Sequence, residues 1–319
     1  MSNNDWRSHC KNHVNESDIK HIQHYDANAK TLFPLVIPQF LKGNINFNND
    51  NDPILLQVLP QKKEHLNHKN YSDDPVGDLK ASSTKGVIHK YHGRILLIAN
   101  GICAVNCRYC FRRNFPYANN HASKNNWQDA IAYIKKHRDI HEVILSGGDP
   151  LMLSIKALKK LTTQLELIPH IKTLRIHSRI PIVAPDRINE NFLEWLKDIS
   201  LKKVMVVHCN HHQELHKDLK ARFNSIAQTD TLLLNQSVLL KNINDDAHIL
   251  SQLSHKLFEY GILPYYLNQL DKANGTQHFR VSNSQAKSIY KKLLQLLPGY
   301  LVPKLVEEIS GKKNKSPLF

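Results

Sequence analysis

Three closely spaced cysteines are the chemically most distinctive residues of this 319-residue sequence. Cys103, Cys107 and Cys110 form a CxxxCxxC pattern directly after an apolar run. Three thiolates at this spacing predict the ligands of a cubane iron–sulfur cluster whose fourth iron stays open for substrate or cofactor. The alternative is structural zinc, which needs four protein ligands. No fourth Cys or His follows in register, and only the distant Cys209 could serve.

A Gly-Gly pair followed by an acid ends a later apolar run and forms a second candidate. Its residues are Ser146, Gly147, Gly148 and Asp149. Glycines let the backbone approach a ligand closely, and the Asp149 carboxylate could pair with a cationic amino group. The alternative is a tight turn without function.

These residues need elements to position them, and apolar runs separated by amphipathic stretches recur from Arg94 onward. The runs are Ile95–Ala99, Glu142–Leu145, Thr173–His177, Lys203–His208, Thr231–Leu234 and Ile262–Leu267. After the first interval they lie about 30 residues apart, the length of one strand, one helix and a return loop. Six such units predict an α/β fold with a parallel sheet, either doubly wound or an incomplete barrel.

In both architectures the chemistry is expected at the carboxyl ends of the strands. Polar residues do follow the apolar runs there: Cys103, Ser146 to Asp149, His177 to Arg179, His208, Asn235 to Gln236 and Asp271. A lone histidine at such a place is often only a core residue, so His208 carries the least weight.

The chain divides into three expected segments. Residues 1–90 are polar and irregular, with helical turns at 17–29 and 35–41, and predict a cap over the main domain. Residues 91–298 hold the six β-α units and end in a helix over 285–297. Residues 299–319 form a short tail that contains Lys315-Ser316-Pro317.

The charge balance is strongly basic, with 43 Lys and Arg against 28 Asp and Glu and a net charge of +15. Such an excess invites nucleic acid, an acidic protein or anionic cofactors. The basic residues are spread along the chain without a long block, so a solvated basic surface explains them equally well. No apolar run is long enough to cross a membrane, the N-terminal stretch is polar, and the odd number of cysteines does not suit a disulfide framework. We therefore expect a cytoplasmic protein.

Five short motifs follow one another along the chain in the same order as in a known enzyme family. They are Cys-Arg-Tyr-Cys-Phe-Arg-Arg (107–113), Leu-Ser-Gly-Gly-Asp-Pro-Leu (145–151), Leu-Arg-Ile-His-Ser-Arg-Ile-Pro (174–181), Asn-Gln-Ser-Val-Leu-Leu (235–240) and His-Phe-Arg (278–280). Together they resemble the lysine 2,3-aminomutase family of radical S-adenosylmethionine enzymes, from about Phe33 to Leu318. The resemblance implies a partial (β/α)6 TIM-like barrel with an N-terminal helical cap and a short C-terminal tail.

The resemblance also implies three cofactors: a 4Fe-4S cluster on the three cysteines, S-adenosylmethionine and pyridoxal 5'-phosphate. The residues matching the S-adenosylmethionine site are Tyr109, Ser146, Gly147, Gly148, Asp149, Arg179, His208 and Gln236. The residues matching the phosphate site of the coenzyme are Lys90, Tyr91 and Arg94. Lys315 before Ser-Pro matches the lysine that carries the coenzyme. The family's glycine-rich loop is replaced here by residues 310–314, so Lys312 or Lys313 could compete with it.

Three further residues match the family's substrate contacts. Arg112 matches the arginine that binds the lysine carboxylate, and a planar guanidinium suits bidentate pairing. Asp271 and Glu308 match the two acids that hold the distal ammonium, with Glu in place of the more usual Asp. Two acids in a basic protein fit a cationic side chain and disfavour glutamate as the substrate.

The implied function is an isomerase that converts α-lysine to β-lysine with a reductant such as flavodoxin or ferredoxin. The chain resembles the branch that supplies β-lysine for translation elongation factor P and its lysyl ligase. One alternative is a stand-alone metabolic lysine 2,3-aminomutase. Another, from a different class, is a non-catalytic iron–sulfur protein that binds nucleic acid, which the acidic pair and the Gly-Gly-Asp loop argue against.

Overall fold

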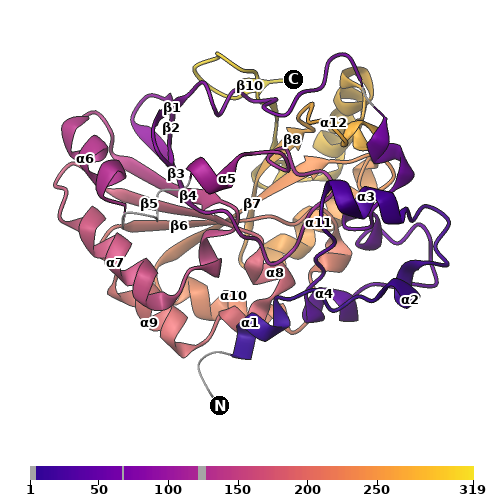
Figure 1. Cartoon of the computed structure of the whole chain (residues 1–319), viewed down its shortest axis with the longest axis horizontal. Helices are drawn as coiled ribbons and strands as arrows, with labels where there is room; N and C mark the ends of the chain where they lie inside the picture. Colours follow the sequence, from indigo (N-terminus) through magenta and orange to yellow (C-terminus); the bar gives the residue numbers. More distant parts are fainter. Residues whose placement is uncertain (1–4, 67, 121–126) are drawn as a thin grey trace.

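One open sheet of ten strands in sequence order organises the computed structural model, which describes residues 5–66, 68–120 and 127–319 (Figure 1). The strands are β1 (Ser82–Thr84), β2 (Val87–Tyr91), β3 (Arg94–Asn100), β4 (Glu142–Gly147), β5 (Thr173–Ser178), β6 (Lys202–Val207), β7 (Thr231–Leu239), β8 (Leu263–Gln269), β9 (Lys304–Glu307) and β10 (Ser316–Pro317). Strands β3 to β9 run parallel to one another. The β1–β2, β2–β3 and β9–β10 pairs are antiparallel.

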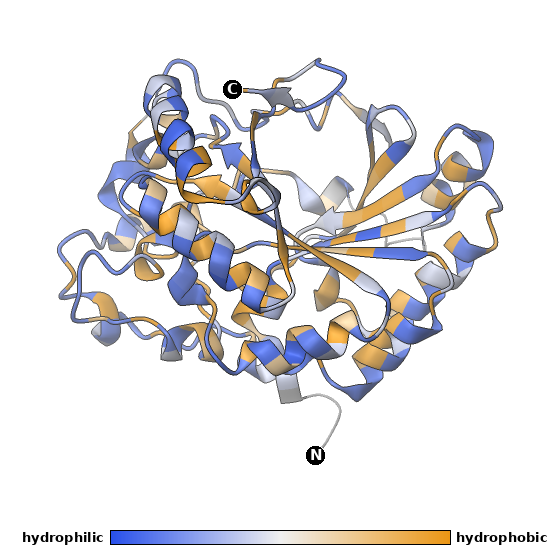
Figure 2. Ribbon diagram, turned by 180° about the vertical axis from the view of Figure 1, so that it is seen from behind, coloured by the Kyte–Doolittle hydropathy of each residue, from blue (hydrophilic) through white to orange (hydrophobic). Residues whose placement is uncertain are grey.

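Helices follow one another around the outside of this sheet (Figure 1). The longer ones are α6 (Gln128–Lys136), α7 (Ile155–Glu166), α9 (Glu190–Asp198), α10 (Leu219–Ala227), α11 (Ala247–Glu259) and α12 (Asn283–Leu296). Two short ones, α5 (Tyr117–Asn120) and α8 (Ile180–Val183), lie between strands and helices. Leu158, Leu161 and Leu165 of α7 are fully buried, because spacings of three and four place them on one helix face. Figure 2 shows the resulting alternation of hydrophobic and hydrophilic bands on the helices.

Polar side chains mark the starts of several helices. Ser154, Asn189 and Asp246 accept hydrogen bonds from backbone N–H groups in the first turns of α7, α9 and α11. Ser282 does the same for α12. Such caps satisfy donors that have no partner within the helix. Within the part of the chain that the structure describes, no helix is long and apolar enough to cross a membrane.

The sequence-based α/β prediction is confirmed, since the six apolar runs coincide with β3 to β8. The four outer strands were not predicted, because residues 1–90 were interpreted as an irregular cap and no strand was expected in the tail. Strands β1 and β10 have three and two residues, too few to show a period of two. They form because β2 and β9 present backbone groups that must be paired.

The N-terminal segment is drawn in indigo in Figure 1 and packs along one side of the molecule. Its helices are α1 (Asp5–His9), α2 (Glu16–Ile19), α3 (Ala27–Leu32) and α4 (Gln39–Gly43), with 3-10 turns η1 (Leu55–Gln57) and η2 (Lys62–His65). Ile19, Ile37 and Leu55 belong to the same buried apolar cluster as Val143 of β4 and Leu174 of β5. The segment therefore shares the main core. The helical turns predicted over 17–29 and 35–41 correspond only partly to α2, α3 and α4.

A buried ion network joins this segment to the loop that carries the three cysteines. Glu64 of η2 accepts from Arg108 Nε at 2.9 Å and from Arg108 Nη2 at 2.5 Å. Arg113 Nη2 donates to the same carboxylate at 2.7 Å. Arg108 also donates to the carbonyls of Phe33 and Ala29. The cysteine loop is thus held by Glu64 through the residues on either side of Cys110.

Replacing Glu64 by Gln should lower the free energy of unfolding by about 3–5 kcal/mol, because two buried guanidinium groups lose their counter-charge. Urea denaturation of the whole chain measures the change. Asp198→Asn is the matched control, since its pair with Lys159 has side chains 65% and 48% exposed and should contribute less than about 1 kcal/mol. Equal effects of the two changes would contradict this reading.

Candidate active site

A cavity of about 340 Å³ runs along the inner face of the sheet. Every residue that the family resemblance assigned to a cofactor or to the substrate lines it: Lys90, Tyr91, Arg94, Cys103, Cys107, Tyr109, Cys110, Arg112, Ser146, Gly147, Gly148, Asp149, Arg179, His208, Gln236, Asp271, Glu308 and Lys315. The cavity is not confined to the carboxyl ends of the strands, because Arg94 at the start of β3 and Tyr265 near the start of β8 also line it. It thus extends further along the strands than predicted.

The three cysteines lie at one end of this cavity as free thiols. Burial raises the pKa of Cys103 well above its ordinary value, and the neighbouring Cys110, Asp149 and Cys107 add to the effect. Burial and Cys107 likewise raise the pKa of Cys110 to about 11. Crowded buried thiols of this kind gain most from a cationic group that binds them as thiolates.

The arrangement of these three thiols does not suit a single metal ion. Among the described residues, no three His, Cys, Asp or Glu side chains converge closely enough to hold a single metal ion. A four-iron cubane binds each thiolate at a separate corner, so its ligands lie further apart than those of a lone ion. The donor set of three thiolates therefore fits a cluster.

Glycines at 147 and 148 let the end of β4 pack against the loop after β3. A Cβ at Gly147, where φ is +116°, would lie 2.6 Å from the Asn100 carbonyl oxygen. A Cβ at Gly148 would lie 2.5 Å from the carbonyl oxygen of Ile102. Residues 146–149 form the glycine loop. A larger residue at position 147 or 148 would displace this loop from the loop that carries the three cysteines. The Tyr117 hydroxyl then donates to the Gly147 carbonyl at 2.8 Å and covers the junction.

Asp149 joins the ends of β4 and β5. Its carboxylate accepts from Ser178 Oγ at 2.8 Å and from the backbone N–H groups of Arg179 and Ile180 at 2.8 and 3.2 Å. The N–H of Leu151 donates to it as well. Burial raises the pKa of Asp149, and these donors oppose the shift. The Asp149 carboxylate is thus satisfied by hydrogen bonds from its own chain.

Arg179 connects the cysteine loop to a buried acid. Its Nη1 donates to Cys107 Sγ at 2.6 Å, and its Nη2 donates to Glu214 Oε2 at 2.8 Å. The guanidinium also lies over the ring of Tyr109. This positive group next to a cluster thiol offsets part of the negative charge that thiolates bring.

Two histidines lie beside this end of the cavity. The rings of His177 and His208 meet edge to face at 5.9 Å, and the Nε2 atom of each is buried without a hydrogen-bond partner in the described structure. Burial, with Arg179 next, lowers the pKa of His208 to about 4. Burial, with His208 next, also lowers the pKa of His177. Both imidazoles are therefore neutral at pH 7.

Lys315, from the C-terminal tail, also enters the cavity. Its Nζ donates to Asn268 Oδ1 at 2.7 Å and lies 5.5 Å from the ring centroid of Tyr266. Glu308 Oε2 lies 3.6 Å away. Arg94 stacks over the Tyr91 ring at 4.8 Å. An amine, a guanidinium and aromatic rings together fit a phosphorylated aldehyde such as pyridoxal phosphate.

Lys312 and Lys313, the alternatives to Lys315, lie outside this cavity. Both are exposed, and neither lines its wall. Lys315 is brought inward because Ser316 and Pro317 pair with Glu307 and Val306 in the sheet.

The acids expected to hold the substrate ammonium differ in their surroundings. Glu308 accepts from the Tyr91 hydroxyl at 2.5 Å and lies 3.5 Å from Lys90 Nζ. Asp271 faces the cavity, and burial raises its pKa to about 7; Lys315 opposes this shift and Glu308 adds to it. A buried acid with an elevated pKa is the group that gains most from an incoming cation.

Several lining residues were missed by sequence reasoning: Asp78, Tyr117, Arg175, Tyr265, Tyr266 and Asn268. A period of two could have found some of them, since Arg175 lies two residues before His177 on β5, and Tyr266 lies two residues before Asn268 on β8. Asp78 lies in a stretch without any pattern. Its contact with Arg112 depends on the fold.

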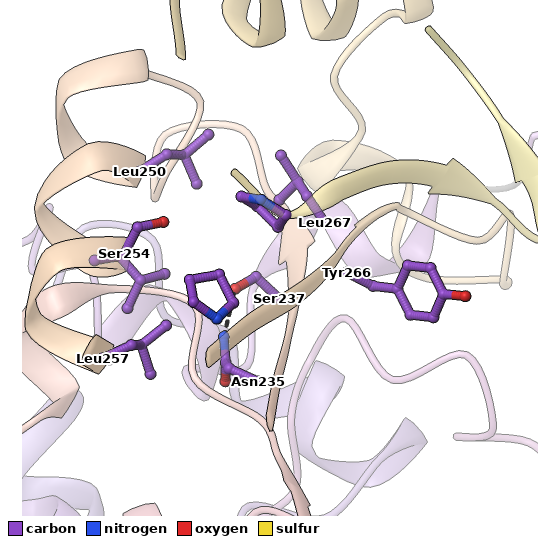
Figure 3. Close-up of a pocket in the computed structure, with 10 residues that line it drawn as sticks. Asn235, Ser237, Leu250, Ser254, Leu257, Tyr266 and Leu267 are labelled. Atoms are coloured by element: carbon purple, nitrogen blue, oxygen red, sulfur yellow. Dashed lines mark hydrogen bonds between the residues drawn. The ribbon is translucent and has the colours of Figure 1, made fainter. Parts of the chain in front are cut away.

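A second, much smaller pocket lies between α11, β7 and β8 (Figure 3). Its volume of about 10 Å³ leaves room for roughly one water molecule. Leu250 and Leu257 form its apolar side, and Asn235 donates to Ser237 within it. The Tyr266 ring points away from it (Figure 3). This pocket is too small for a substrate.

Comparison with known proteins identifies relatives with the chemistry that the cavity residues suggest. Residues 97–226 match the profile of the radical SAM superfamily. The chain is 44% identical to the L-lysine 2,3-aminomutase of Escherichia coli, over 99% of this chain and 95% of that protein. It is 48% identical to the L-lysine 2,3-aminomutase of Haemophilus influenzae, over 90% of this chain and 85% of that protein.

Among solved structures, a radical SAM methyltransferase from Sphaerobacter thermophilus has a similar fold. The TM-score is 0.51 at 15% sequence identity, and the match covers 69% of this chain and 68% of the other. At this identity the likeness concerns the fold alone.

Proposed function

Because this chain belongs to the L-lysine 2,3-aminomutase family of radical S-adenosylmethionine enzymes, we propose that it converts L-α-lysine to L-β-lysine. The observation that carries the proposal is one cavity that joins three thiols, an inward-facing lysine, an arginine and two acids. This set combines a cluster site, a site for a carbonyl coenzyme and a site with opposite charges for an amino acid. We interpret strands β3 to β8 of the open sheet as the six-unit partial barrel expected from the sequence.

The roles of the residues divide along the cavity. When bound, the cluster with S-adenosylmethionine supplies radical hydrogen abstraction, and pyridoxal phosphate supplies an aldehyde for the migrating nitrogen. Cys103, Cys107 and Cys110 would hold the cluster. The glycine loop, Tyr109, Arg179, His208 and Gln236 would surround S-adenosylmethionine.

At the coenzyme end, Lys90, Tyr91 and Arg94 would hold the phosphate. In the structure the Lys90 ammonium already contacts the Val76 carbonyl at 2.7 Å and Asp78 at 2.6 Å. Arg94 would therefore be the main direct donor, with Lys90 adding its charge. Lys315 would hold the aldehyde until the substrate amine replaces it.

At the substrate end, Arg112 would bind the lysine carboxylate, and Asp271 with Glu308 would bind the side-chain ammonium. Arg112 is buried and the Glu308 side chain is only 13% exposed, and burial of this kind strengthens ion pairs with a substrate.

Anaerobic incubation with L-lysine, S-adenosylmethionine, pyridoxal phosphate and a reductant tests the proposal. Separation of α- from β-lysine should show conversion. No β-lysine from protein with a full cluster would refute it. Salt-dependent RNA binding without any amine migration would instead favour the nucleic-acid-binding alternative.

The coenzyme lysine can be identified directly. Borohydride reduction and peptide mapping should place the pyridoxyl group on Lys315, because its Nζ reaches into the cavity and those of Lys312 and Lys313 belong to exposed residues. Lys315→Ala should abolish the label, with Lys313→Ala as the matched control. A label that survives in Lys315→Ala would show that another lysine carries the coenzyme.

We further infer that the product serves the β-lysylation of translation elongation factor P in the cytoplasm, with flavodoxin or ferredoxin as the electron donor. This rests on the resemblance to that branch of the family. The competing purpose is free β-lysine for metabolism. Deleting the gene should remove the β-lysyl mass from elongation factor P, whereas a metabolic enzyme would leave it unchanged.

A further inference from the structure

Asp78 is a buried acid in contact with the proposed substrate arginine. Its side chain lies in the turn before β1 and is only 3% exposed. Asp78 Oδ2 lies 2.6 Å from Arg112 Nε, and Asp78 Oδ1 lies 2.6 Å from Lys90 Nζ. Each carboxylate oxygen thus holds a different cation.

The turn around Asp78 is fixed by a second acid. Asp74 accepts from the backbone N–H groups of Asp78 and Leu79 at 2.7 and 3.0 Å. Burial opposes ionisation of Asp78, but Arg112 and Lys90 outweigh it and hold its pKa below the ordinary value. The Asp78 carboxylate is therefore ionised at neutral pH and fixed in place.

This contact decides which edge of the Arg112 guanidinium faces the cavity. Asp78 uses the Nε–H, Ser146 Oγ lies 3.3 Å from Nη1, and the guanidinium stacks over the Phe111 ring at 4.7 Å. A carboxylate can pair with an arginine through its terminal edge or through its Nε side. With the Nε side taken, the terminal Nη edge is left for a ligand.

We propose that Asp78 is a positioning residue that turns the terminal edge of Arg112 toward the substrate carboxylate and so makes the site selective for an amino acid. The inference rests on the proposed function, since it assumes that Arg112 receives the lysine carboxylate. Asp78 itself touches no substrate. Lys90 keeps it in place from the other side.

Asp78→Asn keeps the size of the side chain and removes its charge, so it tests the proposal. We compare L-lysine with L-lysinamide, whose uncharged carboxamide cannot form the ion pair. Asp78→Asn should raise KM for lysine by about 10- to 100-fold, the effect expected when a binding group shifts by about 1 Å. The inhibition constant of lysinamide should change less than about 3-fold, because the amide gains little from Arg112.

Calorimetric dissociation constants of both ligands should show the same contrast without turnover. Asp198→Asn, in an exposed ion pair with Lys159, should change neither constant. The melting temperature and iron content report whether Asp78→Asn keeps its fold. If it does not fold, Asp78→Glu, which keeps the charge but moves it, should raise KM for lysine while sparing lysinamide.

Equal weakening of lysine and lysinamide would overturn the proposal, because it would show a general disturbance of the cavity. An unchanged KM for lysine would overturn it as well. Failure of the wild-type protein to convert lysine would count against the proposed function instead. In that case the calorimetric comparison still decides whether Asp78 controls carboxylate selectivity.

Discussion

Cys107→Ala should abolish the iron–sulfur cluster and all lysine turnover. Two thiols cannot hold a cubane that needs three protein ligands, and the substitution also removes the acceptor of Arg179 Nη1. Wild-type protein reconstituted without oxygen should contain about four iron atoms per chain, the content of one cubane. The variant should contain close to none, by colorimetric iron and sulfide assays.

Cys10→Ala provides the matched control. Cys10 is a buried thiol in the apolar cluster with the N-terminal segment and does not line the cavity. Its loss should leave the iron content unchanged. Stoichiometric zinc in the wild-type protein, or full iron in Cys107→Ala, would contradict the cluster assignment.

Asp271→Asn should lower kcat/KM for lysine by roughly 30-fold to a few thousand-fold. Removing one partner of a desolvated charge pair costs about 2–5 kcal/mol, and each 1.4 kcal/mol is about a factor of ten. Steady-state kinetics measures the change, and unaltered iron and coenzyme contents show that the cofactor sites are intact. Near-normal kinetics would mean that Asp271 only serves the turn after β8.

The elevated pKa of Asp271 gives this prediction a pH dependence. Below pH 7 the acid gains a proton and loses its attraction for an ammonium. KM for lysine should therefore rise as the pH falls through about 7 in the wild type. Asp271→Asn should lack this inflection, because an amide does not titrate in this range.

The same residue should lower the stability of the ligand-free protein at alkaline pH. The folded chain keeps the Asp271 proton up to a pH of about 7, whereas the unfolded chain releases it near the ordinary pKa of 3.8. Because the folded state binds more protons over that range, stability falls as the pH rises through it. At pH 8, Asp271→Asn should raise the free energy of unfolding by on the order of 1–4 kcal/mol.

Local patterns in the sequence were sufficient for the parallel strands and for the candidate residues. Runs such as Thr231–Leu234 carry their own signal, because a buried strand needs consecutive apolar residues. The cofactor and substrate residues followed from the resemblance of the motifs to a known family. These residues line one cavity, although their individual roles stay predictions.

Contacts between distant segments were beyond sequence reasoning. Asp78 meets Arg112 and Glu308 meets Tyr91 only after the sheet has formed. The glycines at 147 and 148 were expected to make room for a ligand, whereas the structure shows them making room for the chain at Asn100 and Ile102. Pairwise fit of this kind depends on the whole fold and leaves no periodic trace.

The two-residue strand β10 links coenzyme binding to local order at the end of the chain. Its pairing with β9, at Ser316 with Glu307 and Pro317 with Val306, is short, and Pro317 has no N–H to donate. So few hydrogen bonds make local opening of the tail much cheaper than global unfolding. Lys315 precedes this strand directly, so a covalent bond from its Nζ to the coenzyme would tie the tail to the coenzyme in the cavity. Amide hydrogen exchange over residues 315–319 should then slow when the coenzyme binds, and every opening of the tail would withdraw the lysine from the cavity.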